Sequence, residues 1–165
     1  MAISNHIINI VKNKPGMRMK LLTQCGRMPT AEVTADVQKS FGIKDQKAVT
    51  ALITVARIVA RQTPATGAFT GHNPEAKATG NVLRTWSDQT GKKDQVLKLL
   101  TRCVSLDLKY SRSYIESLFN QLLNDGYQID IGRLYGDLVH WDDSSKLSRI
   151  KLITGFSRLN DLVDS

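Results

Sequence analysis

Hydrophobic side chains recur at helical spacing through Lys44–Gln62, and this segment constrains the fold more strongly than any other. They repeat with the 3.6-residue period of an amphipathic helix, and they are Ala48, Leu52, Val55, Ile58 and Val59. Because such a face is stable only when other elements cover it, the segment predicts a long helix packed into a helical core.

Most of the remaining chain has the same helical periodicity. The other predicted helices are Ile3–Asn13, Met17–Met28, Ala31–Phe41, Asn81–Gln89, Asp94–Val104, Leu106–Leu123, Ile131–Trp141 and a last helix with Leu147 and Ile150 in its buried face. No stretch alternates apolar and polar residues over a useful strand length. The sequence therefore predicts an all-α fold.

Capping residues support these boundaries. Thr30 and Asp130 are placed as N-caps, and Asp143 or Ser144 as the cap of the last helix, while Gly126 suits the left-handed position past a helix end. We predict one domain, a compact bundle of eight or nine short helices, with a helical subdomain over about residues 1–90 and a second over about residues 91–165.

One long segment, Thr63–Gly80, has no periodic pattern. It holds two Pro, three Gly and four Thr in 18 residues. We predict a long loop, which in a compact domain is usually functional or mobile.

The charge of the chain favours a polyanionic partner. Lys and Arg number 23 against 15 Asp and Glu, a formal net charge of +8. Residues 1–120 hold 18 of the basic side chains and 8 of the acidic ones, whereas residues 121–165 hold 5 and 7. We therefore favour a nucleic-acid partner over a basic protein whose surface is merely solvated.

A stripe of cations follows one flank of the predicted helix Lys44–Gln62. Lys47, Arg57 and Arg61 share this flank with Thr50 and Thr54, and it holds no acid. We expect the stripe to be exposed, so that replacing its three cations by alanine leaves folding nearly intact. The alternative for Arg57 is a partly buried ion pair with Asp88 or Asp94.

The basic residues form the candidate phosphate-binding set. Its members are Arg27, Lys47, Arg57, Arg61, Lys77, Arg84, Lys98, Arg102, Arg112, Lys146 and Arg149, with Lys92, Lys93, Lys109 and Lys151 in a wider set. Aromatic residues make up only 6%, so stacking platforms for bases are few. We expect such a surface to hold a nucleic-acid backbone with little reading of bases.

Catalytic and metal-binding patterns are weak in this sequence. Gly67–Gly71 lacks the spacing and the lysine of a phosphate loop, and no paired-cysteine or His-Glu-x-x-His zinc motif occurs. His140 with Asp142 and Asp143 is more simply explained by helix ends than by a metal. We predict neither an enzyme nor a cofactor.

The chain is also expected to be a cytoplasmic protein without a membrane partner. Its apolar runs are too short to span a bilayer, and Met1–Val11 has no basic region or cleavage site of a secretory signal. Two cysteines, Cys25 and Cys103, do not make a disulfide scaffold.

A resemblance to a known family is carried by Val96–Asp143 and, more loosely, by the N-terminal half. Its marks are a Leu99-Leu100 pair, a basic helix with Arg112, an Ile129-Asp130 start, the Leu-x-x-Asp-Leu-x-x-Trp pattern of Leu134, Asp137, Leu138 and Trp141, and, upstream, Phe41-Gly42, the loop ending at Gly80 and Arg84. Over most of residues 24–156 the order and spacing resemble the small subunit of the type I-E CRISPR effector complex, Cascade.

This resemblance implies an all-helical, non-enzymatic protein that assembles as a pair along the effector complex. It implies contacts with the backbone subunits that hold the guide RNA, with the large subunit, and with the unwound target DNA, above all the displaced strand. By position it carries a binding role onto Arg27, Lys47, Lys77, Arg102, Arg112, Lys146 and Arg149.

Two alternatives remain open. One is a stand-alone helical DNA-binding regulator with Leu106–Leu123 as recognition helix, although a clean three- to four-residue turn is missing. The other is an enzyme with the Thr63–Gly80 loop as lid and His72 as base, for which no partner residue is identifiable.

Overall fold

The computed structural model describes residues 2–26, 29–64 and 67–157, and within them the fold is all-α. These residues form nine helices: α1 (Ile3–Asn13), α2 (Pro15–Gln24), α3 (Ala31–Phe41), α4 (Gln46–Gln62), α5 (Thr79–Thr90), α6 (Lys93–Ser105), α7 (Leu108–Asn124), α8 (Ile131–Val139) and α9 (Leu147–Ser157). The predicted fold class is confirmed. None of the helices in these ranges is long and apolar enough to cross a membrane.

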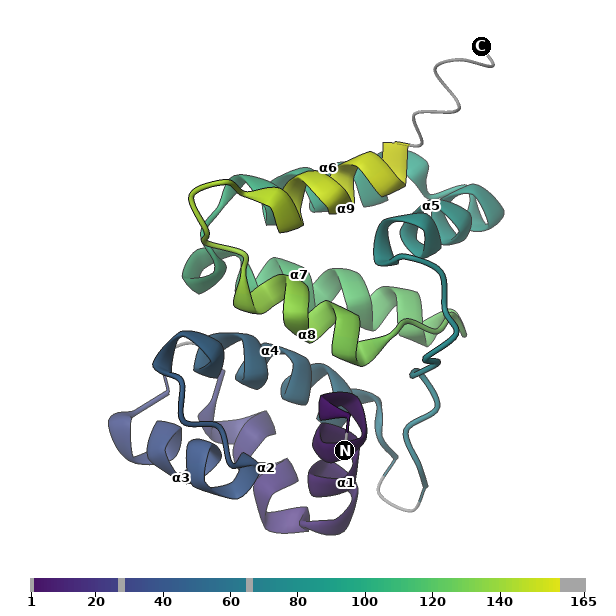
Figure 1. Cartoon of the computed structure of the whole chain (residues 1–165). Helices are drawn as coiled ribbons and strands as arrows, with labels where there is room; N and C mark the ends of the chain where they lie inside the picture. The colour runs from purple at the N-terminus through teal and green to yellow at the C-terminus, as the bar shows by residue number, and fades with distance from the viewer. Residues whose placement is uncertain (1, 27–28, 65–66, 158–165) are drawn as a thin grey trace.

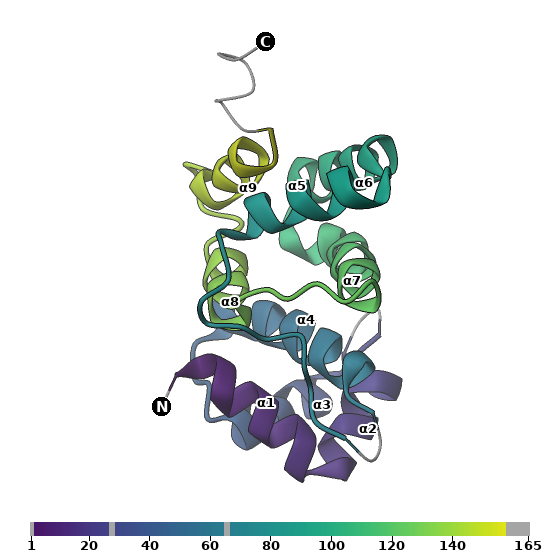
Figure 2. The same ribbon diagram turned by 90° about the vertical axis from the view of Figure 1, so that its right-hand side faces the viewer.

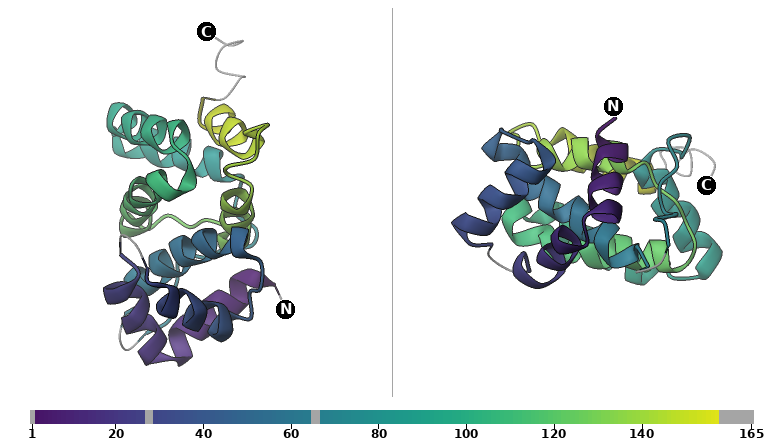
Figure 3. Two further views of the ribbon diagram at one scale, coloured as in Figure 1. Left: turned by 90° about the vertical axis from the view of Figure 1, so that its left-hand side faces the viewer. Right: turned by 90° about the horizontal axis from the view of Figure 1, so that it is seen from below.

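The helices stack in three tiers (Figure 1, Figure 3). α1, α2, α3 and α4 form the lowest tier, α7 and α8 the middle tier, and α5, α6 and α9 the upper one. α4 packs on both helices of the middle tier, and α7 in turn packs on α6. The largest fully buried side chains come from all three tiers; they are Phe41, Trp86, Phe119, Trp141 and Phe156.

Helix α4 is buried more completely than its amphipathic pattern predicts. The expected face is buried, but so are Val49, Ala51, Ile53 and Ala56 on other sides. The reason is its place between tiers, because α1 and α2 cover it from below and α7 and α8 from above. Small and β-branched side chains suit a helix that is enclosed in this way.

Three of the four predicted capping positions are confirmed, whereas Asp143 or Ser144 as the cap of the last helix is wrong, because α9 begins only at Leu147. The Thr30 hydroxyl accepts a hydrogen bond from Val33 N at 3.2 Å, and the Asp130 carboxylate accepts from Gly132 N at 3.0 Å and Arg133 N at 3.2 Å. Gly126 has a φ of 88°, as expected for the left-handed residue past a helix end.

Several of the predicted boundaries differ from the structure; for example, α8 ends at Val139 and not at Trp141. α2 begins at Pro15 and ends at Gln24, and α7 begins at Leu108 after the N-cap residue Asp107. α9 begins at Leu147, whose side chain is 59% exposed instead of buried, as is Ile150 at 54%. The helical period fits either side of α9, so only the packing of α5 decides which side is covered.

Helix α5 belongs to a different group of helices from the one that the predicted subdomain boundary implies. A boundary near residue 90 assigns α5 to the N-terminal group, whereas α5 packs against α9 and α6 in the upper tier. The chain therefore changes tier before α5, within the segment that follows α4.

That segment, described at residues 63–64 and 67–78, connects the lowest tier to the upper tier (Figure 2). It pairs with the α7–α8 connection through Ile129, whose N–H donates to Gly71 O at 2.9 Å and whose carbonyl accepts from Asn73 N at 3.0 Å. The predicted loop is thus confirmed at the described residues 63–64 and 67–78 and is wrong at Thr79 and Gly80, which belong to α5; residues 65 and 66 lie outside the described residues.

We expect Gly80→Ala to destabilise the fold. A Cβ at this position would lie 2.5 Å from Leu152 O and 2.9 Å from Gly155 Cα, both backbone atoms of α9. The free energy of unfolding in urea should fall by about 2 kcal/mol. Gly136→Ala in α8 is the control, since nothing lies within 4 Å there, and it should be neutral or stabilising. Equal stability of both variants would contradict the close α5–α9 contact.

Candidate nucleic-acid interface

Two of the candidate arginines are paired within the fold, Arg112 buried and Arg57 half-buried. Arg57 Nε donates to Glu116 Oε1 at 2.8 Å, and Arg112 Nε donates to Oε2 of the same carboxylate at 3.1 Å. Arg112 is only 7% exposed. The expectation that these cations face solvent is wrong, because α4 and α7 pack through this network.

Each guanidinium also donates to backbone carbonyls near the C-terminal end of α2. Arg57 donates to Leu21 O at 2.6 Å, and Arg112 donates to the carbonyls of Cys25 and Gly26. One carboxylate faces two arginines, and carbonyls at the negative end of a helix compensate the remaining positive charge. The partner of Arg57 is therefore Glu116, and neither Asp88 nor Asp94.

Arg149 is a second internal arginine. It is 4% exposed and donates to Trp141 O at 2.8 Å, to Asp107 Oδ1 at 3.0 Å and to Asp142 Oδ1 at 3.1 Å. Asp142 also accepts from Leu108 N at 2.8 Å, so it caps α7. This network joins the ends of α6 and α8 to the starts of α7 and α9.

Arg84 also has partners within the fold. Its Nε donates to Asp88 Oδ2 at 2.9 Å, one turn along α5, and its Nη1 donates to Phe156 O at 3.2 Å. It contributes to the α5–α9 contact. The predicted α4 stripe is likewise interrupted, because Thr54 is fully buried and Arg57 is paired, which leaves Lys47 and Arg61 exposed at its two ends.

The remaining candidates are exposed on different parts of the molecule. Arg27 lies outside the described residues. The exposed members are Lys47, Arg61, Lys77, Lys98, Arg102 and Lys146. None of these six has an ion-pair partner among the described residues.

Exposed cations meet one exposed and one partly buried tyrosine on α6 and α7, and we call this surface the α6–α7 face. It consists of Lys98, Arg102, Lys109, Tyr110 and Tyr114. The Arg102 guanidinium lies 5.7 Å from the Tyr114 ring centroid, and Lys109 Nζ lies 5.6 Å from that of Tyr110. Tyr110 is 63% exposed, and no carboxylate in the described chain pairs with the three cations.

Sequence reasoning missed the aromatic part of this face. The low aromatic content argued against stacking platforms, but Tyr110 and Tyr114 are spaced four residues apart beside Lys109 and so share one side of a helix. The four-residue spacing of the two tyrosines could therefore have predicted an aromatic pair on one side of this helix. The approach of Arg102 from α6 depends on the tertiary packing of α6 and α7.

An open cleft of about 340 Å³ extends from Lys109 to Lys47. Lys47 comes from the start of α4 and Lys109 from the start of α7, and Asp142 and Asp143 also line the cleft. Two lysines that are 62 positions apart in the sequence therefore flank one cleft, next to the α6–α7 face.

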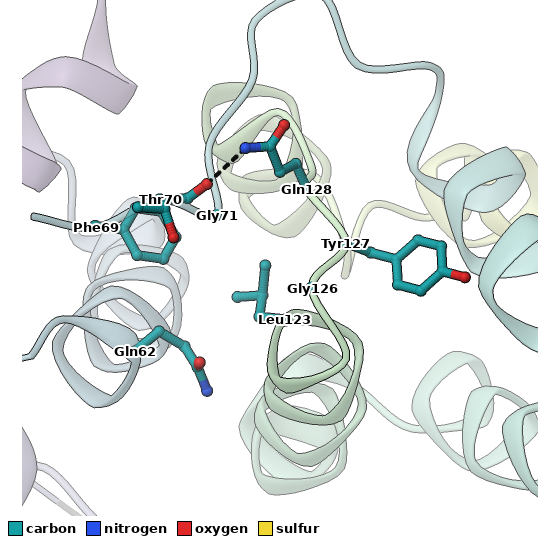
Figure 4. A pocket seen from close by; sticks show the side chains of 8 residues that line it. All are labelled: Gln62, Phe69, Thr70, Gly71, Leu123, Gly126, Tyr127 and Gln128. Atoms are coloured by element: carbon teal, nitrogen blue, oxygen red, sulfur yellow. Dashed lines mark hydrogen bonds between the residues drawn. The ribbon is translucent and has the colours of Figure 1, made fainter. Parts of the chain in front are cut away.

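A smaller cavity of about 110 Å³ lies between residues 69–71 and the end of α7 (Figure 4). Gln62, Phe69, Tyr127 and Gln128 are among its lining residues, and Gln128 Nε2 donates to Thr70 O at 2.7 Å. No carboxylate, histidine, lysine or arginine lines it. The cavity has no group suited to holding a phosphate by charge or to transferring a proton near neutral pH.

The groups considered for enzymatic roles have structural partners. His72 Nδ1 accepts a hydrogen bond from Ile131 N at 3.0 Å, so it helps cap α8. Burial raises the pKa of the Cys103 thiol to about 12, and burial raises the pKa of Cys25 despite nearby Arg112 and Arg57. Such thiols are poor nucleophiles. Within the described ranges no cluster of three or more His, Cys, Asp or Glu is arranged to hold a metal.

The proposed recognition helix of a stand-alone regulator is α7, and most of it is enclosed. Its Arg112, Glu116 and Asn120 are buried against α4, and Ile115, Leu118 and Leu122 are buried elsewhere in the core. Only a narrow stripe that includes Tyr110 and Ser117 faces solvent. A helix enclosed on this many sides cannot enter a major groove without unpacking.

Comparison with known proteins returned no match: no protein-family model, no curated protein and no solved structure matches this chain.

We expect Glu116→Gln to lower the free energy of unfolding by about 3 kcal/mol, because the buried Arg112 and the half-buried Arg57 lose their shared negative charge. Urea unfolding followed by circular dichroism measures the change. Glu75→Gln, at an exposed position of the 63–78 segment, is the matched control and should stay within about 0.5 kcal/mol. The earlier expectation for the alanine triple variant is revised accordingly: Lys47→Ala with Arg61→Ala leaves stability unchanged, whereas adding Arg57→Ala destabilises. Equal stabilities of the Glu116 and Glu75 variants would rule out this role for the arginine pair.

Proposed function

We propose that the chain is the non-catalytic small subunit of a type I-E CRISPR effector complex. In this role it bridges the backbone and large subunits, pairs with a second copy of itself and binds the nucleic-acid backbone, which stabilises the R-loop in antiviral defence. Two things support the proposal: the resemblance over residues 24–156 and an all-α fold of the kind that it implies.

The observation that carries the nucleic-acid part is the α6–α7 face. Lys98, Arg102 and Lys109 lie on neighbouring helices without carboxylate partners in the described chain. Cations on rigid elements bind phosphates and release counterions whatever the base sequence. Exposed Tyr110 adds a ring on which a base of any identity stacks.

Such a face suits the displaced strand of an R-loop. Forming the guide–target duplex replaces one duplex by another of similar stability, so modest contacts between protein and backbone are enough to shift the balance. The displaced strand differs in sequence from target to target, and a surface that holds phosphates without reading bases accepts every one of them.

The other exposed cations lie outside the α6–α7 face and have separate proposed roles. Lys47 adjoins the α6–α7 face through the cleft that it shares with Lys109. Arg61, Lys77 and Lys146 belong to other regions of the surface, where contacts with partner subunits are the alternative to DNA. We assign the internal arginines Arg57, Arg112 and Arg149 to positioning α7 and α9, and so to shaping this face.

Co-expression with the remaining effector subunits and a guide RNA tests the subunit assignment directly. We expect the chain to co-elute with the ribonucleoprotein in size-exclusion chromatography and to have no enzymatic activity alone. Failure to co-elute would contradict the assignment. Sequence-selective binding of an isolated dimer to one duplex would favour a stand-alone regulator instead.

Replacing Lys98, Arg102 and Lys109 together by alanine should weaken target-DNA binding by the assembled complex and make its salt dependence shallower. The slope of log K against log salt should fall by about 2, as expected for three lost contacts to single-stranded phosphates. Gel-shift titrations at several salt concentrations measure both effects.

The matched control removes three exposed lysines of the lowest tier, Lys12, Lys39 and Lys44. It lowers the net charge equally and leaves the α6–α7 face intact. If both triple variants change the slope by the same amount, only overall charge matters and the α6–α7 face has no special role.

A further inference from the structure

Helix α9 has an exposed side that no other described helix covers. It packs mainly on α5, with smaller contacts to α6 and α8, and it lies at the edge of the upper tier (Figure 2). Its buried side includes Arg149, Leu152 and Phe156. The exposed side, which we call the α9 outer face, consists of Lys146, Leu147, Ile150, Lys151 and Thr154.

Two large aliphatic side chains are neighbours on the α9 outer face. Leu147 and Ile150 are each more than half exposed, and residues three apart lie one above the other on a helix surface. Among the described residues they are the only two exposed large hydrophobics that share a helix. Exposed Thr154 continues the same row. Isolated exposed apolar residues are common, whereas adjacent ones on one side of a helix favour an interaction surface.

Lys146, directly before this row, is unfavourable for the isolated fold in two ways. Its φ is 52°, and it is the only described residue other than glycine with a positive φ. The left-handed conformation is costly for a residue with a Cβ. Its cation also lies beside the first turn of α9, where the helix dipole favours an acid and where no acid occurs. A lysine retained against local stability indicates a role for its side chain outside the fold.

Lys146 also has no ion-pair partner among the described residues. The acids nearest to it in the sequence are already paired, because Asp142 binds Arg149 at 3.1 Å and Asp143 binds His140 at 3.0 Å. Lys151 is partly occupied, since burial raises the pKa of Asp137 and Lys151 acts against this increase. Lys146 is therefore the cation of the α9 outer face that a carboxylate of a partner would complement.

The start of α9 is held firmly by the core, so the aliphatic row has a fixed orientation. Arg149, between Leu147 and Ile150 in the sequence, is 4% exposed. It donates to Trp141 O at 2.8 Å and to two carboxylates, and its guanidinium lies 5.6 Å from the Trp141 ring centroid. A surface that is already ordered loses little conformational entropy when a partner binds.

A protein helix fits this face better than a nucleic acid or a membrane does. Phosphates could meet Lys146, but the aliphatic row would then lie against a charged backbone, and nucleic-acid interfaces are polar. A helix that binds a membrane surface needs a larger apolar face than two aliphatic residues provide. A row spaced as Leu147, Ile150 and Thr154 packs into the groove between side-chain rows of another helix.

We propose that the α9 outer face binds an amphipathic helix of a different protein, whose aliphatic side chains pack on Leu147 and Ile150 and whose carboxylate pairs with Lys146. The inference rests on the proposed function, which gives the source of this helix as a neighbouring subunit of the effector complex. None of the α9 outer-face residues belongs to the α6–α7 face, so the same chain can hold its partner subunit and the displaced strand at once.

The test titrates the fluorescently labelled full chain with the complex of the remaining subunits and guide RNA. Ile150→Glu places a charge within the aliphatic row and should raise the dissociation constant at least tenfold. Met19→Glu in α2 is the matched control, because Met19 is 53% exposed and Ile150 is 54% exposed. It should change the dissociation constant less than twofold. Urea unfolding verifies that both variants are folded.

Lys146→Gly separates a binding role from a structural one. Glycine relieves the left-handed backbone, so the urea midpoint should stay the same or rise. The loss of the ammonium group should nevertheless weaken binding to the complex about fivefold, as expected for one lost ion pair at an interface. Unchanged binding by this variant contradicts the carboxylate partner of Lys146.

Equal affinities of the Ile150 and Met19 variants overturn the proposal while leaving the proposed function intact, provided that the natural chain binds the complex. If the natural chain does not bind, the proposed function fails and this inference fails with it. A photocrosslinking amino acid at position 150 then identifies what covers the face. An adduct with a helix of another subunit supports the proposal, whereas an adduct with a second copy of this chain, or none, contradicts it.

Discussion

The shared carboxylate of Glu116 is the interaction on which the arrangement of the lower and middle tiers depends. It binds one arginine from α4 and one from its own helix, and both arginines reach on to carbonyl groups at the end of α2. Three helices therefore meet at one ionic network. Buried charges are tolerable only when they are fully bonded, so the network admits one register of α4 against α7 and sets where the outer side of α7 points.

The same network changes how the charge of the chain should be understood. A net charge of +8 suggests a uniformly basic surface, yet Arg112 and Arg149 are buried and Arg57 is half-buried in an ion pair. What remains exposed for a partner is mainly lysines together with Arg61, Arg102 and Arg133, and none of Lys98, Arg102 and Lys109 forms an ion pair with another described residue. The specificity of such a surface lies in its position and shape, because its charges neutralise phosphates without regard to sequence.

Local patterns predicted the elements well and their surroundings poorly. Helical periodicity identified each of the nine helices, and the caps at Thr30 and Asp130 and the turn at Gly126 follow from side-chain chemistry within a few residues. The partner of Arg57 is Glu116, 59 positions away in the sequence. Patterns that extend over only a few residues cannot predict such a pair. For the same reason an arginine in a solvated stripe and an arginine in an ion pair look alike until α4 and α7 are packed together.

Helix α4 also has a mechanical consequence. It packs against α1 and α2 of the lowest tier on one side and against α7 and α8 of the middle tier on the other, and most of its side chains are buried in these contacts. Neither group retains a complete hydrophobic interior without it, so the two are expected to melt together. We therefore expect the tiers to fold and unfold together, and to differ only in what their outer surfaces bind.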